Sequence, residues 1–448
     1  MVLTMTDMWW HKLKTEVVDT NLETQCGTAV GVSNGTLQYE EINGIPVLAR
    51  TEKLSPVPQV AYDACPGRYC NYPELNEYTF GKQPDSYLSG VIEKAYTGHA
   101  TDKVVRRNGA SGGAISQVLI YLLETKKITG AVCLKMGVEV PWRAKPIIAR
   151  TKRDILDCAQ SIYSVTPVNT ILEELVHEEG PLAYVGLPDQ VAGIRKLQKL
   201  EHPSVQNIEY VLGPYQGTQM YFEAIRSFLR SHGVQSEEEI AELKYRAGEW
   251  PGYLQIVLND GRVLKAEKFY YNYLIPFFVS DSSLQLCDFT NELTDISVGD
   301  AWSPEFEQDR KGHSVILART PKAVDLLKSM QRQNLLHLES IELTKALDMH
   351  GHMLDLKKRG SYIRNNWNRV QPDYGYVPIQ IPPSRIAVEW CLRLFFGVGK
   401  LSIARWAVEH LPMRIVGPCF NWLRKTWKGA SKTTKRKGLR EVEFVVTR

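Results

Sequence analysis

The chain has little cysteine, little excess charge and no long apolar run. Eight cysteines in 448 residues are too few for a disulfide scaffold. The chain has 54 lysine and arginine residues and 50 aspartate and glutamate residues. The resulting net charge of +4 does not by itself indicate nucleic-acid binding. No stretch approaches the roughly 18 apolar residues of a membrane-spanning helix, and the first residues lack the pattern of a secretory leader. These absences predict a cytoplasmic protein with mostly reduced thiols.

The composition that is present is ordinary for a globular protein, with 44% hydrophobic and 23% charged residues. Its patterns change along the chain and predict four parts. Residues 1–84 are rich in glycine and proline, with little that resembles core, and residues 85–335 alternate between helices and short apolar strands. Residues 336–383 form a helical extension, and residues 384–448 form a basic tail. The alternation predicts a mixed α/β fold class, with α+β parts.

Several elements of the α/β part can be placed from local patterns. Apolar residues at helical spacing predict a helix over 113–126, and the sequence AVCLKM after it predicts a short buried strand. The turn sequence Asn259-Asp260-Gly261 lies between two alternating segments and predicts a β-hairpin. Residues 237–248 are interpreted as a further helix.

Two segments run from a loop or strand into a helix. In the first, Ser111-Gly112-Gly113 stands where the loop becomes the helix. Exposed amides at a helix start bind anions, and glycine lets a phosphate approach the backbone, although a capped helix with no ligand explains the same residues. The second segment, residues 185–199, places Asp189 at its helix start, where it also fits a plain helix cap.

A third segment, residues 287–302, places carboxylates at the end of a predicted strand. Asp295 and Asp300 flank Gly299 there, and sites in α/β proteins usually lie at strand ends. Solvated carboxylates in a loop are the alternative explanation. No one of the three segments is specific alone.

Together the segments resemble the coenzyme F420 hydrogenase/dehydrogenase beta-subunit family. The family patterns SGGxxTxLLxxLLE, GxPCQxxGLRK, DxxxELADISxGDAW and GxSxVxxRT are similar to residues 111–124, 186–196, 288–302 and 312–320. The resemblance extends over residues 20–330 and implies a core that binds FAD, preceded by a degenerate ferredoxin-like segment. It implies cofactor contacts from Asn108, Ser111, Gly112, Gly113, Gln190, Asp295, Gly299 and Asp300.

The cysteines depart from the family pattern. Its two ferredoxin-type motifs fall on segments anchored by Cys26 and Cys65, where Ala29, Pro58 and Ala61 occupy ligand positions without a ligand atom. We therefore do not expect a 4Fe–4S cluster or another metal. If a cluster is nevertheless present, its candidate ligands are Cys26, Cys65, Cys70 and Cys287.

The cysteine of the GxPCQ pattern is replaced here by Asp189. A buried carboxylate beside a redox cofactor can act as a general acid with a raised pKa, so Asp189 is the catalytic candidate. His99, His313 and Tyr163 are weaker candidates for a proton donor, chosen because they lie near matched segments. A packing or surface role explains each of those three equally well.

The resemblance implies a FAD-dependent oxidoreductase that moves hydride or electrons without a full iron–sulfur chain. Its soluble donor is expected to be F420 or a nicotinamide, and its substrate a small or lipid-linked molecule. Two alternatives stay open: a non-catalytic scaffold or binding subunit, and a transferase or isomerase acting on a sugar-type ligand. The protein is expected to form a homo-oligomer or to join a partner subunit.

The tail carries most of the excess positive charge. Between Ser384 and Lys428, eight basic residues stand against two acidic ones, with four tryptophans among them. This pattern predicts short helices, separated near Pro412 and Pro418, that lie on the anionic inner face of a membrane. Docking on the protein itself explains the pattern nearly as well, and nucleic acid is not expected as a partner. A basic run follows, made of Lys432, Lys435, Arg436, Lys437 and Arg440.

Overall fold

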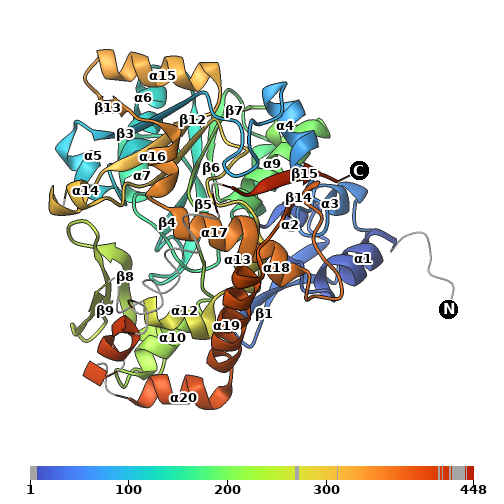
Figure 1. Cartoon of the computed structure of the whole chain (residues 1–448), viewed down its shortest axis with the longest axis vertical. Coiled ribbons are helices and arrows are strands. Elements are labelled where there is room, and N and C mark those ends of the chain that lie inside the picture. The colour runs from blue at the N-terminus through green and yellow to red at the C-terminus, as the bar shows by residue number, and fades with distance from the viewer. Residues whose placement is uncertain are drawn as a thin grey trace.

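The centre of the molecule is an eight-stranded mixed sheet (Figure 1). The computed structural model describes residues 8–267, 272–309, 311–411, 414–415, 417–422, 425, 439 and 441–447. The strand order is β13-β3-β12-β11-β7-β6-β4-β5, in which β11, β7, β6 and β4 are parallel and the outer strands pair antiparallel. The strands are β3 (Lys94–Ala100), β4 (Gly130–Met136), β5 (Ala144–Ala149), β6 (Leu182–Val185), β7 (Ile208–Pro214), β11 (Ile296–Asp300), β12 (Ser314–Ala318) and β13 (Leu336–Ser340).

Strand alternation gives the sheet two buried faces. On β4, Ala131 and Cys133 belong to the hydrophobic cluster that includes α6 and α15, whereas Val132 between them belongs to the cluster that includes α9. The predicted helix over 113–126 is confirmed as α6. The helices around the sheet are α5 (Lys103–Asn108), α6 (Ala114–Glu124), α7 (Lys152–Asp157), α8 (Leu172–Leu175), α9 (Pro188–Lys199), α14 (Pro304–Asp309) and α15 (Pro321–Arg332).

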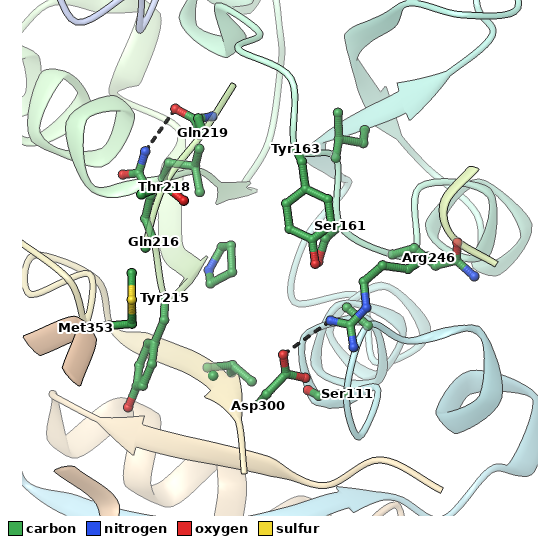
Figure 2. Close-up of a pocket in the computed structure, with 18 of the residues that line it drawn as sticks. Ser111, Ser161, Tyr163, Tyr215, Gln216, Thr218, Gln219, Arg246, Asp300 and Met353 are labelled. Atoms are coloured by element: carbon green, nitrogen blue, oxygen red, sulfur yellow. Dashed lines mark hydrogen bonds and ion pairs between the residues drawn. The ribbon is translucent and has the colours of Figure 1, made fainter. Parts of the chain in front are cut away.

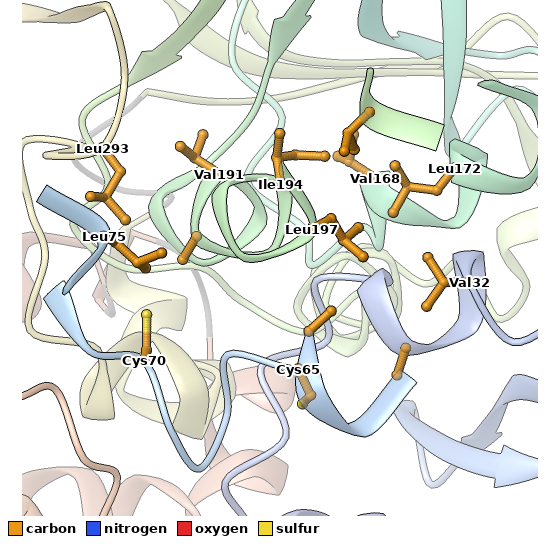
Figure 3. Packing of buried hydrophobic residues seen from close by; sticks show 14 of the residues in the cluster. Val32, Cys65, Cys70, Leu75, Val168, Leu172, Val191, Ile194, Leu197 and Leu293 are labelled. Carbon is orange, nitrogen blue, oxygen red and sulfur yellow. The ribbon is translucent and has the colours of Figure 1, made fainter. Parts of the chain in front are cut away.

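The N-terminal segment packs on the α9 face (Figure 3). Leu13, Val17 and Ala61 are fully buried in the same cluster as Val191 and Ile194 of α9. The expectation of little core in this segment is therefore wrong, because its apolar residues are completed by a helix more than a hundred residues away. Its elements are α1 (Met8–Leu13), α2 (Thr28–Gly31), β1 (Leu37–Ile42), β2 (Ile45–Arg50), α3 (Gln59–Asp63) and α4 (Tyr72–Phe80).

A second, three-stranded antiparallel sheet lies beside the main body and includes the predicted hairpin. The interpretation of 237–248 as a helix is wrong, because this segment contains strand β8. Ile240 and Leu243 pair with β9 and pack in the cluster of this sheet, so tertiary pairing overrides local helix preference. The elements are α10 (Glu223–Arg230), β8 (Ile240–Ala247), β9 (Tyr253–Leu258), β10 (Val263–Glu267), α12 (Ile275–Phe278) and α13 (Asp281–Gln285).

From Leu343 onward the chain is mostly helical, and it then returns to the N-terminal side. Strand β15 (Glu443–Val446) pairs with β14 (Tyr376–Ile379), and α19 and α20 follow one edge of the molecule (Figure 1). No described helix is both long and apolar enough to cross a bilayer. Pro412 and the basic run at 432–440 fall outside the described residues. The helices are α16 (Leu343–Asp348), α17 (Gly351–Asp355), α18 (Ser361–Asn365), α19 (Pro383–Gly399) and α20 (Ser402–His410).

Candidate functional site

A cavity of about 1170 Å³ lies at the carboxyl ends of the central parallel strands. Its wall includes the residues that follow β6, β7 and β11, which is where α/β proteins usually bind ligands. Part of the small sheet and part of α19 complete the wall. The polar side chains that line it include those labelled in Figure 2, which are Ser111, Ser161, Tyr163, Tyr215, Gln216, Thr218, Gln219, Arg246 and Asp300.

The start of α6 forms one side of the cavity. Gly113 precedes the helix with a φ of 72°, a left-handed conformation that glycine adopts without strain. No described side chain caps the helix, and Ala114, Ile115 and Ser116 of its first turn line the cavity. The positive end of the helix dipole is therefore available to an anionic group in the cavity.

The neighbouring serine and glycine are also held by the protein itself. Ser111 Oγ lies 2.7 Å from Ser314 Oγ, and the Gly112 amide donates to Ser314 Oγ at 3.0 Å. A Cβ on Gly112 would lie 2.7 Å from the Gly98 carbonyl oxygen. Gly112 is thus required for packing against β3, and the cavity wall includes Ser111 and Gly113 but not Gly112 among the described residues.

An ion pair joins the small sheet to the end of β11. Arg246 Nη1 donates to Asp300 Oδ2 at 3.3 Å, and the Trp250 indole donates to Asp300 Oδ1 at 3.1 Å. Trp250 also lies against Trp302, with ring centroids 4.7 Å apart. Burial acts to lower the pKa of Arg246, but the charge of Asp300, together with Tyr163 and hydrogen bonds to both residues, raises that pKa. The guanidinium is therefore a fixed positive charge at the cavity wall.

Several buried polar atoms of the wall are unsatisfied. Arg246 Nη2, Gln216 Oε1 and the Tyr215 hydroxyl have no hydrogen-bond partner among the described residues. Gln216 and Arg246 are only 4% and 5% exposed. A buried polar atom without a partner costs free energy, so this wall is suited to a ligand that supplies donors and acceptors.

The other residues expected to bind a cofactor divide into two groups. Gln190 and Gly299 line the cavity, whereas Asn108 and Asp295 are not among its described lining residues. Asp295 instead accepts from the Val211 amide at 2.8 Å and lies 3.6 Å from Arg195. Its carboxylate therefore connects Val211 of β7 and Arg195 of α9 to the residues just before β11.

Asp189 lies behind this wall, in the first turn of α9. It is buried, is not a described lining residue, and its Oδ1 has no described hydrogen-bond partner. Burial raises the pKa of Asp189 to about 6 and that of nearby Glu23 to about 7. The raised pKa agrees with what the sequence suggested for this carboxyl. Its position behind the wall does not favour direct contact with a substrate in the cavity.

The four candidate cluster ligands lie on the same side of the sheet. Cys65, Cys70 and Cys287 belong to the hydrophobic cluster around α9 (Figure 3), and Cys26 lies near Cys65 and Asp189. Burial raises the pKa of Cys65 to about 11 and those of Cys70 and Cys287 to about 12. Within the described residues, no three His, Cys, Asp or Glu side chains are grouped as ligands of one metal ion.

The three weaker proton-donor candidates are separated in the structure. Tyr163 lines the cavity and lies beside Arg246 (Figure 2). The rings of His99 and His313 meet edge to face, with centroids 5.1 Å apart, and neither residue is a described lining residue. Only the tyrosine is placed to touch a bound molecule.

Comparison with known proteins decides the family. The family is described as coenzyme F420 hydrogenase/dehydrogenase, beta subunit; its N-terminal part matches residues 95–173, and its C-terminal part matches residues 180–344. The chain belongs to the coenzyme F420 hydrogenase/dehydrogenase beta-subunit family. This confirms the resemblance carried by the motifs, and the matched residues contain the start of α6 and the end of β11.

The relatives are subunits and enzymes named for coenzyme F420. The F420-dependent sulfite reductase of Methanocaldococcus jannaschii is 26% identical over 380 residues, which cover 80% of this chain but 54% of that protein. The F420 hydrogenase subunit beta of Methanococcus voltae is 27% identical over 263 residues, 57% of this chain and 87% of the relative. The chain thus spans about half of the sulfite reductase and most of the hydrogenase subunit. These relatives establish an oxidoreductase family.

A solved structure shows the same fold. A chain of the F420-reducing [NiFe] hydrogenase complex from Methanosarcina barkeri superposes with a TM-score of 0.51 at 18% identity, covering 64% of this chain and 98% of that one. The mixed α/β fold class is confirmed.

The cofactor prediction is wrong in naming FAD. The family and its relatives are named for coenzyme F420, and none of those names gives FAD. For the same reason, the prediction that a 4Fe–4S cluster is absent is not upheld. The assumption of FAD came from the resemblance. Of the two glycines expected to let a phosphate approach, Gly112 packs against β3 and Gly113 lines the cavity.

Sequence reasoning missed the residues of the cavity wall that come from outside the motifs. Arg246, Tyr215 and Gln216 were not expected there, nor were Phe395 and Phe396 of α19. Had residues 240–247 been interpreted as a strand, the position of Arg246 in a sheet would have indicated its place near the cavity. The α19 residues gave no local signal, because only the tertiary fold brings them to the cavity.

Proposed function

We propose that this chain binds coenzyme F420 in the cavity and acts as the F420-dependent subunit of an oxidoreductase. The observation that carries the proposal is one cavity wall that combines an uncapped helix start with Arg246, whose Nη2 has no described partner. F420 is a deazaflavin with an anionic tail, and two positive groups are suited to that tail. When bound, the deazaflavin supplies hydride transfer.

The residues of the chain would hold the coenzyme rather than react with it. The first turn of α6 and Arg246 bind anionic groups, while Gln216 and Tyr215 offer unsatisfied polar atoms to the ring system. Asp300 is fixed by Arg246 and Trp250, so it orients the guanidinium. Of the proton donors considered from the sequence, Tyr163 is the one that lines the cavity, where it would hold or move a proton.

The relatives also guide the proposal on partners. Several of them are named as beta subunits, and the solved relative is part of a hydrogenase complex. We propose that this chain likewise works with a partner subunit in the cytoplasm, exchanging hydride between F420 and a small or lipid-linked substrate.

Fluorescence titration of the purified chain with F420 tests the proposal. We expect saturable binding that weakens with added salt, because the coenzyme tail is anionic. FAD and a nicotinamide coenzyme serve as comparison ligands at equal concentration. Absence of F420 binding by folded protein would overturn the proposal and favour a non-catalytic scaffold.

A further inference from the structure

The helix pair α19–α20 presents an unusual apolar surface. Ile386, Trp390, Leu394 and Val398 recur every four residues along one face of α19, and all are exposed. Leu394 is 70% exposed. The surface continues over the next turns through the exposed residues Leu401, Ile403, Trp406, Leu411, Ile415 and Trp422. Large exposed apolar side chains that gather on one part of a protein often mark a contact with another protein or with a membrane.

The opposite face of the helix pair is fixed to the protein. Arg385 and Glu389 are fully buried, and Arg385 bonds Asp355 at 2.9 Å and Glu389 at 2.7 Å. On α20, Glu409 pairs with Arg230 at 2.6 Å. Buried ion pairs on α19 and a partly exposed ion pair on α20 therefore fix one face of the helices to the protein and leave the apolar stripe exposed.

The charge of the pair favours an anionic surface. Glu389 and Glu409 are the only acidic residues between 383 and 425. Glu389 is paired with Arg385, and Glu409 is paired with Arg230. Arg393 lies over the rings of Trp367 and Trp390 beside the stripe, whereas Lys400 pairs with Asp281. Tryptophan together with arginine and lysine is the composition of helices that lie in a membrane interface.

The cavity reaches this same surface. Phe395 and Phe396 of α19 line the cavity, and Phe395 is also 42% exposed beside the stripe. Arg246 and Asp300 line the same cavity. One cavity therefore contacts both apolar side chains of the helix pair and the polar side chains proposed to hold the coenzyme.

We propose that α19–α20 rests on an anionic membrane and that the cavity takes an amphiphilic substrate from it. The hydrocarbon chain of that substrate would lie along Phe395 and Phe396, with its polar group directed toward the coenzyme held at Arg246. The redox role of that polar group rests on the proposed function, whereas membrane docking does not.

Vesicle flotation tests the docking surface. We expect the full chain to bind vesicles of phosphatidylcholine and phosphatidylglycerol and to bind pure phosphatidylcholine more weakly. The double variant Leu394→Asp/Trp406→Asp should lose about tenfold or more in binding, since it places two charges on the apolar stripe. Leu54→Asp is the matched control, because Leu54 is 95% exposed and lies far along the chain from the stripe. Equal binding by all three proteins, or none by wild type, would overturn the docking proposal.

Photocrosslinking tests the substrate class. The probe is a dodecyl phosphate with a diazirine at the end of its chain, and its label should map to residues 392–396 of the folded protein. Unlabelled dodecyl phosphate should compete, whereas inorganic phosphate should not. Label spread over the surface without competition would overturn the amphiphile proposal. F420 affinity is measured on the same sample, so a failed crosslink with intact F420 binding contradicts this inference alone.

Discussion

Arg246 Nη1 lies 3.3 Å from Asp300 Oδ2 and joins β8 of the small sheet to the end of β11 in the large one. The two residues are 54 positions apart, and both line the cavity. The remaining nitrogen, Arg246 Nη2, has no described hydrogen-bond partner. One guanidinium therefore both ties two sheets together and offers a donor to a ligand.

Replacing this arginine should weaken coenzyme binding. Arg246→Lys keeps the charge but cannot make the forked contacts, and Arg246→Met also leaves Asp300 without its ion pair. We expect F420 affinity to fall about tenfold in the lysine variant and further in the methionine variant. Fluorescence titration measures both, with Arg230→Met as a control arginine that is ion-paired and is not a described lining residue. Unchanged affinity in Arg246→Met would contradict the site.

Gly112 should tolerate no side chain. A Cβ there would lie 2.7 Å from Gly98 O and 2.9 Å from Ser314 Oγ, so Gly112→Ala must displace β3 or the start of α6. We expect a loss of about 1–3 kcal/mol in the free energy of unfolding. Gly397→Ala is the control, since open space surrounds that position on α19, and it should be neutral or stabilising by up to about 1 kcal/mol. Equal unfolding midpoints of the two variants in urea would contradict this account.

Some residues that the sequence singled out line the cavity, and their role in binding a cofactor stays a prediction. Gly299 and Asp300 line it because β11 ends at the edge where the parallel strands have their carboxyl ends, and Ser111 lines it from the loop before α6. Asp295 shows the limit of that reasoning. Its carboxylate accepts a hydrogen bond from the Val211 amide, a contact that depends on how β7 and β11 pair and that local sequence does not contain.

The other side of the cavity depends on pairing that local patterns do not contain. Arg246 belongs to a segment with helix-forming residues, and its strand exists because Leu243 and its neighbours pair with β9. Phe396 reaches the cavity because buried ion pairs hold α19 in place. Long-range charge pairing of this kind leaves no local periodicity in the sequence.

The raised pKa of Asp189 should make stability depend on pH. Burial raises this pKa from 3.8 to about 6, so the folded chain holds a proton that the unfolded chain has released. The free energy of unfolding therefore falls as pH rises from about 4 to about 6, by at most about 3 kcal/mol. Asp189→Asn removes this loss. Urea unfolding should show a gain in stability for the variant at pH 7.5 that is much smaller at pH 4.5, and an equal difference at both values would contradict the burial.

The buried ion network should hold α19 in place. Arg385 bonds the carboxylates of Asp355 and Glu389, and all three side chains are fully buried. Arg385→Met leaves both carboxylates with one fewer partner in a low-dielectric interior, so we expect a loss of about 3–5 kcal/mol in the free energy of unfolding. Lys145→Met removes an exposed ion pair with Glu139 and should cost less than about 1 kcal/mol. Urea unfolding followed by tryptophan fluorescence compares the two variants. A loss in Arg385→Met no larger than in the surface variant would mean that apolar packing, rather than charge pairing, holds α19 against the protein.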